Sequence, residues 1–145
     1  MLVELSCDKF IENDKPRGPI RFTTGLNSVI GANDGANSIG KSTFLLVIDF
    51  IFGGSDYVDE AADVIENVGH HTINFEFDFY GKHYFFSRST DNSAFVNICD
   101  ENYNITNHLS KEDYCNFLAK SYRFASDNLL FRQVMSPFIR VWGRD

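Results

Sequence analysis

The sequence predicts an α/β fold built around a phosphate-binding loop (P-loop), with an antiparallel β-meander added to that core. Two observations support this prediction. Residues 35–42 read Gly-x-x-x-x-Gly-Lys-Ser between an apolar segment and a helix-forming segment. Residues 72–80 alternate between apolar and polar side chains, which is typical of a half-buried antiparallel strand.

The P-loop motif lies in a context that favours phosphate binding. Residues 26–30 read as a short buried strand, and residues 43–52 read as a helix that Gly53-Gly54 ends. Backbone N–H groups of such a loop can surround a phosphate chain at a helix N-terminus. Lys41 can reach the β- and γ-phosphates, and the Ser42 hydroxyl can ligate Mg²⁺. The structural alternative is a glycine-containing turn that happens to precede Lys-Ser.

The middle of the chain reads as a meander followed by a helix. Residues 72–80, 83–89 and 94–99 are expected as strands, with a type II′ turn at Gly81-Lys82. Ser110 is the expected N-cap of a helix whose apolar stripe contains Tyr114, Phe117, Leu118 and Tyr122.

The rest of the chain completes one lobe spanning residues 1–145. We expect strands at residues 2–10 and 20–23, a loop at 12–19 and a short helix near 60–66. The lobe divides into a strand, P-loop and helix core at 1–54, the meander at 70–100, and a helical end at 108–145.

Composition limits the function classes. The chain has 145 residues, 43% apolar residues and 15 Phe, which indicates about one folded domain. Its net charge of −7 argues against DNA binding by this lobe alone. Four arginines crowd the C-terminal quarter, and the simplest interpretation of them is solvated surface: Arg123, Arg132, Arg140 and Arg144.

Several features predict a cytoplasmic protein without a membrane partner. The longest apolar run is far shorter than the ~20 residues that a membrane helix needs, and the first residues do not resemble a signal peptide. The three cysteines, Cys7, Cys99 and Cys115, form no Cys-x-x-Cys pair, so zinc and a disulfide framework are poorly supported.

Other candidate sites are weaker. His70-His71 has no third metal ligand at a suitable spacing, and a row of Phe residues at period two is more often core than a base-stacking surface. A carboxylate for Mg²⁺ and water activation is also hard to find. Asp49 follows an apolar run but lies on the P-loop helix, and Asp100-Glu101 reads as a turn.

The chain resembles the N-terminal half of an ABC-type ATPase head. The resemblance rests on residues 22–31, which read Phe-Thr-Thr-Gly-Leu-Asn-Ser-Val-Ile-Gly, and on Gly40-Lys41-Ser42-Thr43. It is closest to the SMC, RecN and double-strand-break-repair branch. The end of the P-loop helix, residues 48–54, and the Phe-rich meander resemble a bacterial, largely uncharacterised subgroup with proposed roles in defence.

The resemblance implies an ATP and Mg²⁺ site with a role for each motif residue. Gln133 would stand at the end of a strand as the glutamine that contacts Mg²⁺ and the attacking water; a surface glutamine is the alternative. The remaining implied roles are phosphate binding by Gly35, Asn37, Gly40 and Lys41, Mg²⁺ ligation by Ser42, and α-phosphate contact by Thr43.

The resemblance also implies partners. No signature motif or Walker B motif is evident in the sequence, so a C-terminal lobe would supply them, and ATP would join two heads as a homodimer. The chain alone would then bind ATP with little or no hydrolysis, and DNA would be contacted only by the intact protein. Two alternatives remain open: a self-contained small P-loop NTPase or kinase, and a non-catalytic nucleotide-binding scaffold.

Overall fold

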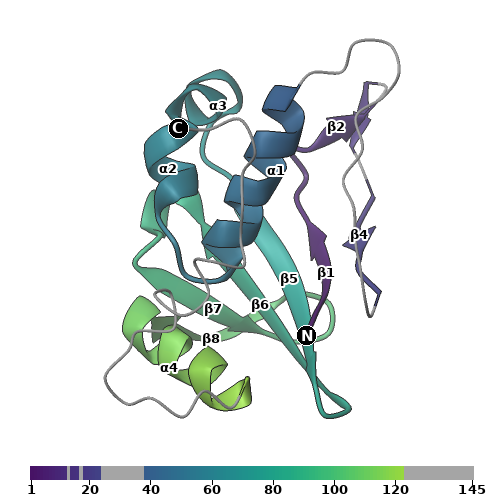
Figure 1. Ribbon diagram of the computed structural model, residues 1–145, viewed down its shortest axis with the longest axis vertical. Helices are drawn as coiled ribbons and strands as arrows, with labels where there is room; N and C mark the ends of the chain where they lie inside the picture. Colours follow the sequence, from purple (N-terminus) through teal and green to yellow (C-terminus); the bar gives the residue numbers. More distant parts are fainter. Residues whose placement is uncertain (13, 17, 24–37, 123–145) are drawn as a thin grey trace.

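The described chain forms one six-stranded sheet and a separate small hairpin. The computed structural model describes residues 1–12, 14–16, 18–23 and 38–122. The strands of the sheet lie in the order β4-β1-β5-β6-β7-β8 (Figure 1). They are β1 (Leu2–Ser6), β4 (Ile20–Arg21), β5 (Thr72–Phe79), β6 (Lys82–Ser89), β7 (Phe95–Cys99) and β8 (Ile105–Ser110).

The expected α/β fold built around a P-loop core is wrong. Every pairing in the six-stranded sheet is antiparallel, so the described residues form an α+β fold. Strand β1 pairs with β5 on one side and β4 on the other, which places the N-terminal segment in the same sheet as the meander. The motif specifies a local loop and helix start, whereas strand direction depends on distant pairings. The strand expected at residues 26–30 lies outside the described residues.

Strand β5 forms the centre of the hydrophobic core. Ile73, Phe75, Phe77 and Phe79 are buried, and the residues between them are only half-buried, which confirms the predicted alternation. The expected partner strands are also found, as β6 and β7.

The turn between β5 and β6 differs from the expected one. Phe79 pairs with Lys82, so the loop is Tyr80-Gly81 and not Gly81-Lys82. Both loop residues have positive φ, 59° and 84°, which is typical of a type I′ turn. The Asp78 Oδ1 atom accepts the Gly81 N–H at 2.8 Å and holds this turn.

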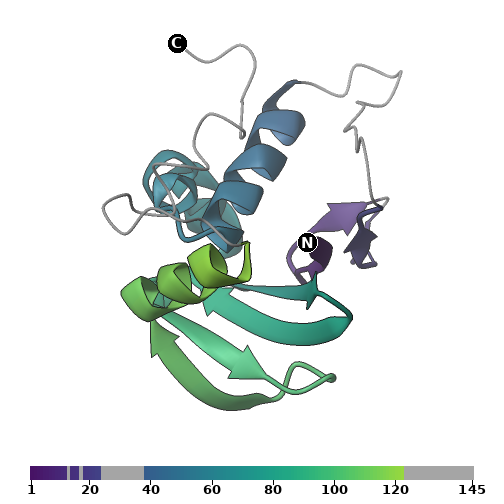
Figure 2. The ribbon, with the colours of Figure 1, turned by 60° about the horizontal axis from the view of Figure 1, so that its bottom comes forward.

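Four described helices lie along the chain. They are α1 (Ser38–Ile51), α2 (Asp56–Glu60), α3 (Ala62–Val68) and α4 (Lys111–Ser121). Figure 2 shows α1 and α4 on the same side of the sheet, and their buried residues join one cluster with those of β5 and β7. In the described part of the chain, no helix is long and apolar enough to span a membrane.

Helix α4, the last helix of the described residues, begins as the sequence predicts. The Ser110 Oγ atom accepts the Asp113 N–H at 3.1 Å, which confirms the N-cap. Tyr114 and Leu118 of the predicted stripe are buried, while Phe117 and Tyr122 pack at the edge of the core.

Three features of the described chain differ from the expectation. Strand β8 pairs with β7 along the edge of the sheet. A small hairpin of β2 (Ile11–Glu12) and β3 (Lys15–Pro16) lies where the sequence predicts a loop. In place of one helix near residues 60–66, α2 and α3 meet at Ala61.

Candidate functional site

The Gly-Lys-Ser part of the motif lies at the start of α1, with Gly40 and Lys41 in the first turn and Ser42 directly after it. The helix starts at Ser38, earlier than the expected start at Thr43, so Gly40, Lys41 and Ser42 are helical. The first four N–H groups of a helix have no partner within it. The unpaired backbone N–H groups and the positive end of the helix macrodipole therefore both lie at the Gly-Lys-Ser sequence.

The charge at the start of α1 differs from that of the other described helices. Its first turn contains no acidic residue, and Lys41 adds a positive charge. Carboxylates stabilise a helix start but repel an incoming anion. They occur in the first turns of the other three helices: Asp56 and Asp59 in α2, Asp63 in α3, and Glu112 and Asp113 in α4. Within the described part of the chain, α1 therefore has the helix start that best suits an anion.

An aromatic contact connects the segment before the P-loop motif with the helix after it. The rings of Phe22 and Phe44 stack with centroids 6.3 Å apart. Phe22 directly follows β4, and its N–H donates to the Val3 carbonyl at 2.8 Å. Since Phe44 lies in the second turn of α1, the chain leaves the sheet beside the helix that it enters after residue 37.

The remaining motif residues are only partly covered by the structure. Gly35, Asn37 and Gln133 lie outside the described residues, as do the four C-terminal arginines. Thr43 follows Ser42 in α1 and is half-buried.

The end of α1 has the backbone geometry that the sequence predicts. Gly53 has a φ of 95°, and its N–H donates to the Phe50 carbonyl at 3.2 Å. The Gly54 N–H donates to the Asp49 carbonyl at 2.9 Å. This pair of bonds is a Schellman motif, which confirms that Gly53-Gly54 ends the helix.

A buried arginine holds the same end of the helix. The Arg88 Nη1 atom donates to the Phe50 and Gly54 carbonyls, each at 2.7 Å. Nε and Nη2 donate to the Ser93 carbonyl at 2.9 and 2.6 Å, and the guanidinium lies 4.1 Å from the centre of the Phe50 ring. Arg88 is only 1% exposed. Its positive charge also complements the negative end of the helix macrodipole.

Sequence reasoning missed Arg88, although a signal was present. Arg88 pairs with Ile73, just as Phe86 pairs with Phe75 and Tyr84 with Phe77. It therefore stands in the apolar row of β6, where a charged residue needs several hydrogen-bond partners.

A tyrosine of α4 makes the third contact with the end of α1. The Tyr114 hydroxyl donates to the Ile51 carbonyl at 2.6 Å. Burial raises the pKa of Tyr114 well above its usual value, so the hydroxyl keeps its proton. Donors from β6 and α4 thus fix one end of α1, while its other end carries Gly40, Lys41 and Ser42.

The Asp100-Glu101 pair belongs to a turn, as the sequence predicts. Asp100 Oδ1 accepts the N–H groups of Asn102 and Asn104 at 2.8 and 2.9 Å, and Oδ2 accepts Asn104 Nδ2 at 3.1 Å. Hydrogen bonds from Asn104 and Asn102 lower the pKa of Asp100. Its oxygens stabilise the β7–β8 connection, which leaves it a poor candidate for Mg²⁺.

The two neighbouring histidines have separate surroundings. The Gly69 carbonyl can only accept, so His71 Nδ1 donates to it at 2.9 Å, and the Tyr57 hydroxyl donates to Nε2 at 2.6 Å. His71 is buried, whereas His70 is exposed and lies 2.9 Å from Thr90 Oγ1. Residues 1–12, 14–16, 18–23 and 38–122 contain no group of three or more His, Cys, Asp or Glu placed to hold a metal ion.

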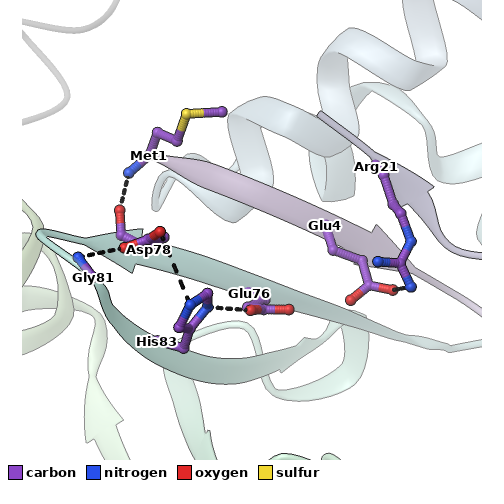
Figure 3. A network of polar contacts seen from close by, with 7 residues as sticks. All are labelled: Met1, Glu4, Arg21, Glu76, Asp78, Gly81 and His83. Carbon is purple, nitrogen blue, oxygen red and sulfur yellow. Dashed lines mark hydrogen bonds and ion pairs between the residues drawn. The ribbon is translucent and has the colours of Figure 1, made fainter. Parts of the chain in front are cut away.

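The face of the sheet opposite α1 and α4 carries a row of charged side chains (Figure 3). Glu4 of β1 lies directly opposite Glu76 of β5. Arg21 Nη2 lies 3.8 Å from Glu4 Oε1, and His83 lies 2.6 Å from Glu76 and 3.9 Å from Asp78. Desolvation raises the pKa of Glu4; Arg21 opposes this rise, and Glu76 adds to it.

We expect Glu4 and Asp100 to give opposite pH dependence. The raised pKa of Glu4 stabilises the fold below the ordinary value of 4.5, and this contribution is lost as the pH rises through the folded value. Glu4→Gln should therefore gain stability relative to the wild type between pH 4 and pH 7. The lowered pKa of Asp100 has the reverse sign: its contribution is present above the ordinary value of 3.8 and is lost as the pH falls below it, so Asp100→Asn should lose stability relative to the wild type as the pH rises from about 2 to about 4. Urea unfolding across both pH intervals checks this, and a change of the same sign in the two variants would contradict it.

Comparison with protein-family models, curated proteins and solved structures found no match. The function must therefore be argued from this chain's own residues and their chemistry.

Proposed function

We propose that the chain binds ATP with Mg²⁺ at the start of α1. The observation that carries the proposal is the position of Gly40 and Lys41 in the first turn of a 14-residue helix without acidic residues at its start, with Ser42 directly after them. Unpaired N–H groups, the helix macrodipole and the lysine charge then act on the same phosphates. The described donors lie at the start of a helix, so the proposal does not require a parallel sheet.

Each motif residue has a proposed role that follows the resemblance to ATPase heads. The Lys41 ammonium reaches the β- and γ-phosphates, and the Ser42 hydroxyl ligates Mg²⁺. The bound ion neutralises phosphate charge. The other proposed roles are phosphate binding by the backbone of Gly35, Asn37, Gly40 and Lys41, α-phosphate contact by Thr43, and γ-phosphate sensing by Gln133.

Hydrolysis is proposed to need a second lobe. The reaction requires a carboxylate that holds Mg²⁺ and a group that orients water. Asp49 is buried in α1, and the oxygens of Asp100 are used in a turn. The chain would therefore supply one wall of the site, and a C-terminal lobe together with a second head would supply the other. ATP binding would then drive association of two heads.

The wider role is part of the same proposal. The resemblance places such heads in DNA-related or defence processes in the cytoplasm. The net charge of −7 disfavours DNA binding by this chain, so we propose that other parts of the intact protein contact DNA.

Lys41→Ala is expected to weaken Mg·ATP binding while leaving the fold intact. Each charge-assisted bond between the ammonium and phosphate oxygens contributes about 1.5–3 kcal/mol. The dissociation constant should therefore rise at least about tenfold. Titration with a fluorescent ATP analogue measures binding, and the melting temperature reports the fold.

Lys111→Ala is the matched control. Lys111 is the exposed first residue of α4, whose start is already capped by Ser110 and carries two acidic residues. Removal of the Lys111 side chain should leave the affinity for Mg·ATP unchanged. Equal affinity of folded Lys41→Ala and the wild type would contradict the proposed site. Turnover by the chain alone would favour the self-contained NTPase, and absence of binding would contradict both the proposed ATP site and the nucleotide-binding scaffold.

A further inference from the structure

Three carbonyl groups at and just after the end of α1 accept hydrogen bonds from buried side chains of other elements. Arg88 of β6 donates to the Phe50 and Gly54 carbonyls, and Tyr114 of α4 donates to the Ile51 carbonyl. Arg88 is 1% exposed and Tyr114 is 0% exposed, so water does not compete for these bonds. Arg88 also donates to the Ser93 carbonyl, which lies outside α1 and fixes the guanidinium itself.

These contacts differ in kind from the apolar packing of α1. Buried residues of the helix, such as Val47 and Ile51, join the core cluster. Hydrophobic attraction is non-directional, so it holds the helix on the sheet but defines its axial position and rotation weakly. Hydrogen bonds depend steeply on distance and angle. The three carbonyl contacts therefore define where α1 lies along its own axis.

The position of α1 sets the position of its first turn. A helix of 14 residues is about 21 Å long and moves as a rod. Binding groups must be held within about 0.5 Å of their working geometry. We propose that Arg88 and Tyr114 are positioning residues, which place the Gly40-Lys41-Ser42 turn for phosphate binding. This inference rests on the proposed ATP site and adds residues that touch no ligand.

Tyr114→Phe tests the proposal without disrupting the core. The phenyl ring keeps the ring contacts with Phe75 and Phe86, and only the donor to the Ile51 carbonyl is lost. We expect the affinity for Mg·ATP, measured well below the melting temperature, to fall about fivefold because the binding turn is less well placed.

Tyr57→Phe is a matched control. It also removes a buried hydroxyl with a 2.6 Å hydrogen bond, but that bond goes to His71 and not to α1. Both variants should lower the melting temperature to a similar extent, and only Tyr114→Phe should weaken binding. Equal affinities for the two variants would overturn the positioning role while leaving the ATP site in place. A wild-type chain that fails to bind Mg·ATP would overturn both.

Discussion

Phe77→Asp is expected to unfold the protein at 25 °C. Phe77 is fully buried in β5. Loss of a core aromatic side chain costs roughly 3–5 kcal/mol, and an unpaired carboxylate in an apolar site costs several kcal/mol more. The sum approaches the whole stability of a small domain, about 5–15 kcal/mol. The new carboxylate would lie among five aromatic rings, whose centroids are 5.2–6.5 Å from the centroid of the Phe77 ring: Phe52, Phe75, Phe79, Phe86 and Tyr122. Circular dichroism and thermal unfolding measure the effect.

Asn74→Asp provides the control on the same strand. Asn74 is half-buried on the opposite face of β5, between Ser6 and Ser87 of the neighbouring strands. The same carboxylate there should change stability by no more than about 0.5 kcal/mol. Equal losses for Phe77→Asp and Asn74→Asp would show that the two faces of β5 do not differ as described.

Arg88→Ala is expected to destabilise the protein by roughly 3–5 kcal/mol. The substitution removes the guanidinium that lies over the Phe50 ring and the donors to three carbonyls, those of Phe50, Gly54 and Ser93. A buried carbonyl that loses its partner costs about 1–3 kcal/mol. The free energy of unfolding in urea measures the loss.

Arg21→Ala is the corresponding surface control. The Arg21 side chain is 76% exposed and lies 3.8 Å from Glu4, so its removal should change stability by no more than about 0.5 kcal/mol. A loss below about 1 kcal/mol for Arg88→Ala would contradict the structural importance of its carbonyl contacts.

Local patterns predicted much of the sheet and the ends of two helices. Alternation in β5 identified the buried Phe row because side chains of a strand point to opposite faces in turn. Gly53 ended α1 because a glycine readily adopts positive φ, and Ser110 began α4 because its hydroxyl accepts a free N–H group.

Features that depend on distant partners could not be read in the same way. The expected P-loop α/β core was wrong because a motif says nothing about which strands pair, and β1 pairs with β5 about 70 residues later. Strand β8 has the sequence Ile-Thr-Asn-His-Leu-Ser and lies at the sheet edge. Because most of its residues are exposed, its sequence lacks the alternation of apolar and polar residues that marks a half-buried strand. The Tyr80-Gly81 turn follows from the register of β5 and β6.

For the candidate site, the sequence motif and the structure give different information. The motif predicts phosphate and Mg²⁺ binding by Gly40, Lys41 and Ser42, and the structure shows that their backbone lies at a helix start. Arg88 and Tyr114 were not recognised as contacts of α1, because their partners are carbonyls of residues 34 to 63 positions away. Such contacts appear only once the chain is folded.

Chemical-shift mapping with Mg·ATP tests the proposed binding site most directly. Mg·ATP is titrated into the ¹⁵N-labelled chain, and the amide resonances are followed. Binding at the start of α1 should produce the largest shifts at Gly40 and Lys41, because their N–H groups face the phosphates. The amides at the start of α4, Lys111 to Asp113, should not move. Unchanged Gly40 and Lys41 resonances at saturating Mg·ATP, or shifts centred on another part of the chain, would contradict the proposal.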